Sequence, residues 1–217
     1  MKTLRILIAD DHDIVREGLR RLLQPQAHWT ICDEASTGRE AVEKAKQHQP
    51  HVVVMDFSMP ELNGLEATRQ IRKALPGTEV LILTMHDSEQ LAREILAAGA
   101  RGFLLKTHAR QHLVSAVTAL AEHQPFFDAK VSALLLENFL NPESTGPGPS
   151  PGSRLTPRER EILQLIAEGC TNKEVAARLA VSVKTIEAHR SNIMNKLDLH
   201  SASQLVLYAV RNNIVQA

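Results

Sequence analysis

The feature that most constrains the fold is a series of short apolar runs, rich in Val, Ile and Leu, in the first half of the chain. The runs LRILIAD, HVVVMD, EVLILT and RGFLLK are almost continuously apolar, as strands buried on both faces of a parallel sheet are. A weaker strand, WTICDEA, follows the first of them. Helical patterns separate the strands, so we predict a doubly wound, five-stranded parallel sheet. The expected helices cover about 14–23, 38–48, 65–73, 88–98 and 109–121.

A break in composition divides the chain between Asn141 and Ser153. Ten of these thirteen residues are Pro, Gly or Ser, and the segment has no apolar side chain to bury in a core. Such a segment is typical of a linker. The apolar stretch FFDAKVSALLLENFL just before it is expected to form an extra helix. We therefore predict a first domain over 1–122, the extra helix and linker over 123–153, and a second domain over 154–217.

Charge and cysteine content narrow the classes of protein. The net charge is zero, but residues 154–217 hold nine basic and six acidic residues, whereas the preceding 153 residues hold 16 basic and 19 acidic ones. This asymmetry favours a polyanionic partner for the second domain only. Two cysteines without a metal-ligand spacing argue for a reducing compartment. No signal peptide or membrane span is expected, so the predicted location is the cytoplasm, without a membrane partner.

The four strong strands each end in a polar residue. These residues are Asp10 with Asp11 next to it, Asp56, Thr84 and Lys106. In the common strand order 2-1-3-4-5, the third strand neighbours the first and the fourth at about 5 Å. The sequence therefore predicts three carboxylates, a hydroxyl and an ammonium around one point at the carboxyl edge of the sheet.

That set of groups suits a divalent cation and a phosphoryl group. Three ionised carboxylates repel one another, and Mg²⁺ relieves this repulsion while keeping positions open for water and phosphate. One aspartate can then attack phosphorus while Thr84 and Lys106 hold the phosphoryl oxygens.

The same residues carry a resemblance to a known family. ILIADDHDIVREGL, VVVMDFSMPELNGLEA, VLILTMHD and AAGARGFLLK resemble the receiver domain of bacterial two-component response regulators, over about residues 4–121. The resemblance implies a flavodoxin-like fold with Asp56 as the phosphorylated residue. It also implies that Asp11 and Asp56 bind Mg²⁺ directly, that Asp10 acts mainly through water, and that the Ser58 backbone carbonyl is a further ligand.

Three more positions match the family's switch. Thr84 corresponds to the conformational switch residue, and Lys106 corresponds to the phosphate-binding lysine. Phe103 corresponds to the aromatic residue that turns inward when the switch residue moves toward the phosphoryl group.

After the linker the pattern is helical throughout. Thr156 to Glu159 has the form of a capping box with proline at the first helical position. Further helices are expected from about Asn172 to Leu179, from a cap at Ser182 to Leu197, and from a cap at Ser201. The short turn at 180–182 gives this region helix-turn-helix character, so we predict a small all-α domain. From the pattern alone, the polar face of its third helix could either lie in solvent or contact DNA.

This region resembles the LuxR-type DNA-binding domain, on the segment LTPREREILQLIAEGCTNKEVAARLAVSVKTIEAHRSNIMNKLDLHS. The resemblance implies that the third helix enters the major groove. The implied base contacts are Lys184, Glu187, Ala188 and Ser191, and the implied phosphate contacts are Thr171, Asn172, Thr185 and Arg190. In this family the last helix forms the dimer interface, for which the candidates are Leu205, Val206, Tyr208 and Ala209.

The leading hypothesis is a transcription regulator rather than an enzyme. A histidine kinase would phosphorylate Asp56 with Mg²⁺, and the phosphorylated chain would form a homodimer and bind promoter DNA. Two alternatives remain at this point. The first is an aspartyl-phosphate phosphotransferase or phosphohydrolase with an incidental helical tail. The second is a protein-interaction adaptor that does not touch DNA.

Overall fold

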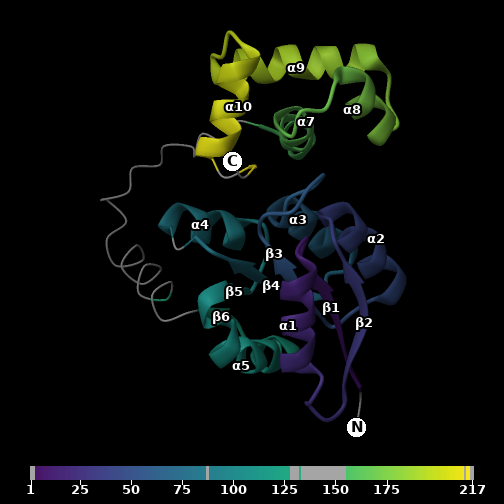
Figure 1. Cartoon of the computed structure of the whole chain (residues 1–217), viewed down its shortest axis with the longest axis vertical. Helices are drawn as coiled ribbons and strands as arrows, with labels where there is room; N and C mark the ends of the chain where they lie inside the picture. The colour runs from purple at the N-terminus through teal and green to yellow at the C-terminus, as the bar shows by residue number, and fades with distance from the viewer. Residues whose placement is uncertain (1–2, 87, 128–131, 133–154, 213, 216–217) are drawn as a thin grey trace. The chain divides into compact units, whose positions relative to one another are not determined.

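Strand and helix alternate through the first 127 residues, as the apolar runs predicted (Figure 1). The computed structural model describes residues 3–86, 88–127, 132, 155–212 and 214–215. The strands of this part are β1 (Leu4–Ala9), β2 (Trp29–Ala35), β3 (Val52–Asp56), β4 (Glu79–Thr84), β5 (Gly102–Leu105) and β6 (Phe126–Phe127). The helices are α1 (Asp13–Leu23), α2 (Gly38–His48), α3 (Gly64–Ala74), α4 (Glu89–Ala97), the 3₁₀ turn η1 (Lys106–His108) and α5 (Ala109–Ala121).

All neighbouring strands run parallel, in the order β2-β1-β3-β4-β5-β6. This confirms the predicted parallel α/β fold and the order of its first five strands. The register pairs Asp56 with Leu83 and Thr84 with Leu105. The ends of β3, β4 and β5 are therefore level, and the residues that end them lie along one edge.

The sheet is apolar on both faces because helices cover both. One face forms a core with α1 and α5, in which Ile6, Val54 and Leu83 pack with Leu19 and Leu113. Helices α1 and α5 contact each other, and so do α2 and α3. A strand covered in this way has no solvent side for polar residues, which explains the uninterrupted Val, Ile and Leu runs.

The sheet has six strands, not the five predicted. Phe126 and Phe127 were expected to begin an extra helix, but they form β6 and pair with Gly102 and Phe103 of β5. The pairing with β5 satisfies backbone groups that an isolated helix start would leave unpaired. Residues 128–131 and 133–153, which hold the remainder of the predicted helix and the linker, lie outside the described residues.

The second compact unit is helical. It consists of α7 (Pro157–Ala167), α8 (Asn172–Arg178), α9 (Val183–Leu197) and α10 (Ala202–Arg211). Thr156 and Thr171 each form a full capping box with the glutamate three residues later. Ile162, Val175, Ile186, Ile193 and Leu205 form its core. None of the described helices has the length and apolarity to cross a membrane.

Candidate functional site

The carboxyl edge of the sheet gathers the polar residues that follow its strands. Asp10 directly follows β1, Asp56 and Thr84 end β3 and β4, and Lys106 directly follows β5. Asp10, Asp56 and Thr84 are only 0%, 3% and 2% exposed. Because burial of an unpaired polar group is costly, such groups are held by specific partners.

Lys106 joins the two buried aspartates. Its Nζ lies 2.7 Å from Asp10 Oδ2 and 2.9 Å from Asp56 Oδ1. At these distances the ammonium forms close ion pairs with both carboxylates. The long side chain thus reaches across from β5 to β3 and β1, as the strand order predicted.

The environment raises the pKa of Asp56 and that of Lys106. Burial is the main cause that raises the pKa of Asp56 from 3.8 to about 6, and the negative charge of Asp10 adds to it while Lys106 opposes it. Burial lowers the pKa of the Lys106 ammonium, but its hydrogen bonds and charge pairing with Asp10 and Asp56 outweigh burial and raise it. The edge therefore carries excess negative charge that one lysine does not neutralise.

The donor atoms at this edge suit a divalent cation. Ligand atoms of Asp10, Asp11, His12 and Asp56 lie within 4.8 Å of one another. Three of these four groups are carboxylates, the ligands that Mg²⁺ prefers. Ser58 is half-buried two residues after Asp56. The residues present therefore fit Mg²⁺, and the sequence reasoning missed only His12 in this cluster.

Gly64 is a second residue that the sequence reasoning missed. It begins α3, and its N–H donates to the carbonyl of Phe57 over 2.8 Å. A Cβ at this position would overlap the Asp56 carbonyl oxygen. Glycine is thus required for α3 to start directly beside the end of β3.

The two switch candidates are buried on neighbouring strands. The backbone N–H of His86 donates to Thr84 Oγ1 over 3.1 Å, so this hydroxyl accepts a bond from the loop after β4. Phe103 is only 1% exposed and pairs with Ile82 in the sheet register. In this structure the aromatic side chain is therefore turned into the protein.

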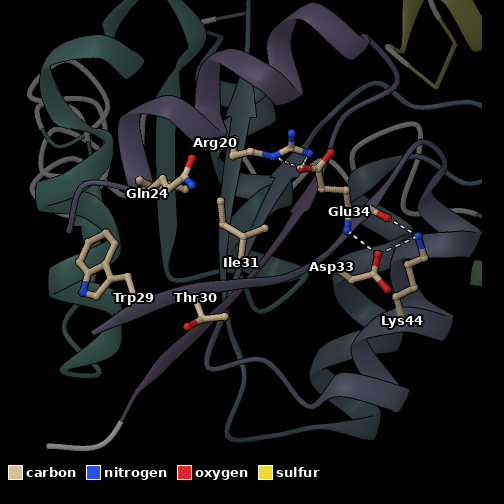
Figure 2. Close-up of a pocket in the computed structure, with 9 residues that line it drawn as sticks. Arg20, Gln24, Trp29, Thr30, Ile31, Asp33, Glu34 and Lys44 are labelled. Atoms are coloured by element: carbon tan, nitrogen blue, oxygen red, sulfur yellow. Dashed lines mark hydrogen bonds and ion pairs between the residues drawn. The ribbon is translucent and has the colours of Figure 1, made fainter. Parts of the chain in front are cut away.

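A separate pocket of about 620 Å³ lies along β2, at the edge of the sheet. Figure 2 shows that its charged residues face one another from α1, β2 and α2. Arg20 Nε donates to Glu34 Oε1 over 2.7 Å, and Lys44 Nζ lies 3.0 Å from Asp33 Oδ1. Because these charges are paired, the pocket has little left to offer a charged ligand, and none of the predicted site residues lines it.

In the helical unit, α8 and α9 have the geometry of a helix-turn-helix. Ala180 adopts a left-handed backbone with φ of 52°, which turns the chain between the two helices. Ser182 then caps α9, and its Oγ accepts from the Thr185 N–H over 3.1 Å. The predicted cap and turn are both present.

The predicted DNA contacts are accessible on this motif. Those that the structure leaves exposed are Thr171, Lys184, Thr185, Glu187, Ala188 and Ser191. Asn172 and Arg190 are half-buried because they meet each other, with Arg190 NH1 at 3.5 Å from Asn172 Oδ1. This contact ties the start of α8 to the middle of α9.

The structure corrects the predicted dimer surface on α10. Leu205 and Ala209 are 0% exposed and belong to the core of their own unit. The apolar residues on the outward side are Val206 and Leu207, at 38% and 48% exposure, and Tyr208 is half-buried. Because this helix is apolar nearly all round, its sequence pattern could not show which side packs in the core of its own unit.

Comparison with known proteins assigns both units. Residues 6–118 match the response regulator receiver domain, and residues 153–209 match the bacterial regulatory proteins of the luxR family. The oxygen regulatory protein NreC of Staphylococcus carnosus is 42% identical, over 98% of this chain and 99% of that protein. The chain is a LuxR-family response regulator.

Two solved structures resemble this response regulator. RcsB from Salmonella enterica serovar Typhimurium, bound to promoter DNA with a phosphomimetic, aligns with a TM-score of 0.61 at 26% identity, over 95% of this chain and 98% of that one. A LuxR-family two-component response regulator from Aurantimonas sp. SI85-9A1 aligns with a TM-score of 0.61 at 34% identity, over 64% and 99%. The regulator is thus a DNA-binding transcription regulator of a two-component system, and the adaptor alternative is not favoured.

Proposed function

We propose that Asp56 is the phosphoacceptor of this regulator and that a sensor histidine kinase is its phosphodonor. The observation that carries the proposal is the buried Asp56 carboxylate, 2.9 Å from Lys106 Nζ and beside the carboxylates of Asp10 and Asp11. A nucleophile with a cation and a metal-binding cluster at hand has the parts that phosphoryl transfer requires.

The proposed transfer uses each of the edge residues. An Asp56 carboxylate oxygen attacks phosphorus, the bond from phosphorus to the kinase histidine breaks, and that histidine leaves. Lys106 then pairs with a phosphoryl oxygen in place of Asp56 Oδ1, and the Thr84 hydroxyl turns toward another. Phe103, which is already buried in this structure, would stay turned inward and pack beside Thr84 in its new position.

The metal is proposed to be Mg²⁺. Asp11 and Asp56 would bind it directly, Asp10 mainly through water, and Ser58 through its backbone carbonyl. Bound there, Mg²⁺ would neutralise the carboxylates and stabilise the charge of the phosphoryl oxygens. The chain would then take the phosphoryl group from its donor onto its own Asp56 and slowly hydrolyse the product. This activity makes the alternative of a phosphotransferase or phosphohydrolase enzyme unnecessary.

Mass spectrometry after incubation with a small acyl phosphate tests this proposal. The wild type should gain one phosphoryl group when Mg²⁺ is present, and none in EDTA. Asp56→Asn should gain none. Asp13→Asn is the matched control, because Asp13 is an aspartate near the site whose side chain is 89% exposed. Labelling of Asp56→Asn at the wild-type level would refute the assignment.

The helical unit is proposed to read promoter DNA through α9. Lys184, Glu187, Ala188 and Ser191 would face base edges, and Thr171, Asn172, Thr185 and Arg190 would contact phosphates. The exposure of Thr171, Lys184, Thr185, Glu187, Ala188 and Ser191 supports a DNA-contacting role for this face. Phosphorylation is proposed to favour a homodimer through Val206, Leu207 and Tyr208 of α10, so that two recognition helices meet two half-sites. We place this activity in the cytoplasm.

A further inference from the structure

His12 lies between the acidic pair and α1, at the N-cap position of that helix. N-cap residues are usually Ser, Thr, Asp or Asn, because their side-chain oxygens accept a hydrogen bond from the first turn. His12 makes no such side-chain bond. Its imidazole therefore does not cap α1.

The imidazole instead faces the carboxylates. His12 Nδ1 lies 2.7 Å from Asp11 Oδ1 and 3.4 Å from Asp10 Oδ1. Neighbouring ligands of an octahedral ion with bonds of about 2.1 Å lie about 3 Å apart, so these two distances bracket the value for ligands of one ion. The ligand atoms of His12, both acidic neighbours and Asp56 also lie within 4.8 Å of one another.

His12 and Lys106 approach Asp10 at different oxygens. Lys106 Nζ contacts Asp10 Oδ2, whereas His12 Nδ1 is near Oδ1. A cation between Asp10 Oδ1, Asp11 and Asp56 thus has the imidazole within reach without displacing the lysine from Asp10. The His12 side chain is 63% exposed, so it is free to adjust to an ion.

We propose that His12 is a nitrogen ligand that gives this receiver site affinity for late first-row divalent cations, in competition with Mg²⁺. Carboxylates and water suit Mg²⁺ and Mn²⁺, whereas imidazole suits ions such as Co²⁺, Ni²⁺ and Zn²⁺. The inference rests on the proposed function, since it assumes a cation at the acidic edge. It adds that the residue after the acidic pair sets which cation binds there.

Electron spin-echo spectroscopy of bound Cu²⁺, a late first-row ion that imidazole suits, tests the coordination directly in the full chain. Wild-type protein should show coupling of the metal to an imidazole nitrogen, and His12→Leu should lose that coupling. His112→Leu is the matched control, because His112 is exposed on α5 and outside the acidic edge. His12→Asn provides a second variant that suits the N-cap position and lacks the imidazole.

Calorimetric titrations with Co²⁺ and with Mg²⁺ measure the consequence. The Co²⁺ affinity of His12→Leu should fall about tenfold, the lower end of the cost of losing a group that supports a metal site, while the Mg²⁺ affinity stays at the wild-type value. Cu²⁺ bound without nitrogen coupling, or an unchanged Co²⁺ affinity in both His12 variants, would overturn the inference. Mg²⁺ binding that is absent, or that survives Asp11→Ala, would instead contradict the proposed function.

Discussion

At Gly64 the fold leaves no room for a side chain, because a Cβ would overlap the Asp56 carbonyl oxygen. Gly64→Ala should therefore displace the start of α3 and lower the free energy of unfolding by about 1–3 kcal/mol, as overpacking does. Since the displaced carbonyl belongs to the phosphoacceptor, phosphorylation should slow as well. Thermal unfolding and labelling with an acyl phosphate measure the two effects.

Gly18 supplies the control for this substitution. It lies inside α1, and a Cβ added there would meet no other atom within 4 Å. Gly18→Ala should raise stability by roughly 0.5–1 kcal/mol, because alanine favours the helix. Equal stability of the two alanine variants would show that the contact at Gly64 is relieved at no cost.

The raised pKa of Asp56 makes stability depend on pH. Its pKa is about 6 in the folded protein, mainly through burial, against an ordinary 3.8. The folded state then binds more protons than the unfolded state between these values, so stability falls as pH rises through that window. In metal-free buffer near pH 7, Asp56→Asn should be more stable than the wild type by roughly 1–3 kcal/mol.

The difference should shrink as the pH falls and disappear well below the ordinary pKa of 3.8, where Asp56 is protonated in both states. Added Mg²⁺ should stabilise the wild type and not the variant, since only the wild type keeps the full set of carboxylates. Matching unfolding curves of the two proteins at neutral pH without metal would contradict the assigned cause of the shift.

Single residues differ in how far the sequence reveals them. Asp10, Asp56 and Lys106 could be predicted because each follows an apolar run, and parallel strands bring their ends to one edge. His12 and Gly64 could not, since the orientation of one imidazole and the space beside one carbonyl depend on the assembled backbone. Neither leaves a pattern along the chain.

Among the elements, α9 carries two lysines with different surroundings. Lys196 Nζ pairs with Glu159 at 2.7 Å, whereas Lys184 is exposed on the proposed DNA face. Lys184→Ala should weaken operator binding and relax the sequence preference at one base pair, because Lys184 is proposed to face a base edge. Lys196→Ala should retain both the affinity and the preference. Fluorescence anisotropy with operators changed at single base pairs compares the two variants.

Helix α10 has one side in the core and one side exposed. Leu207→Glu places a charge on the exposed side, so it should weaken dimer formation and operator binding while the unfolding temperature stays unchanged. Leu205→Ala removes a core side chain and should cost about 2–5 kcal/mol of stability. Sedimentation of the phosphorylated chain and binding to whole and half operators measure the first effect. Full dimerisation of Leu207→Glu would rule out this surface.

Two elements show where sequence patterns reach their limit. Phe126 and Phe127 precede an apolar stretch that fits a helix, but pairing with β5 holds them in a strand. In α10 nearly every position from Leu205 to Val210 is apolar, so periodicity could not separate the core side from the exposed side. Both outcomes depend on neighbours distant in the sequence.

At the scale of the whole molecule, each unit has its own core. In the helical unit, α7 to α10 pack around Ile162, Val175 and Leu205. We predict that residues 155–217 fold when produced alone, and that residues 3–127 do so as well. Circular dichroism with thermal melting tests both fragments. A helical fragment without a cooperative transition would show that it depends on the rest of the chain.

The ion pairs along β2 have a consequence for how copies of this protein can meet. An exposed edge strand invites pairing with a strand of another molecule, and charged side chains along it discourage that pairing. Here β2 carries Asp33 and Glu34 with Lys44 and Arg20 against them, and β6 at the other edge spans two residues. Neither edge is a good template for fibrils or for sheet-to-sheet dimers. We therefore expect association of this regulator to use helix surfaces, where a small change of charge or packing can reverse it.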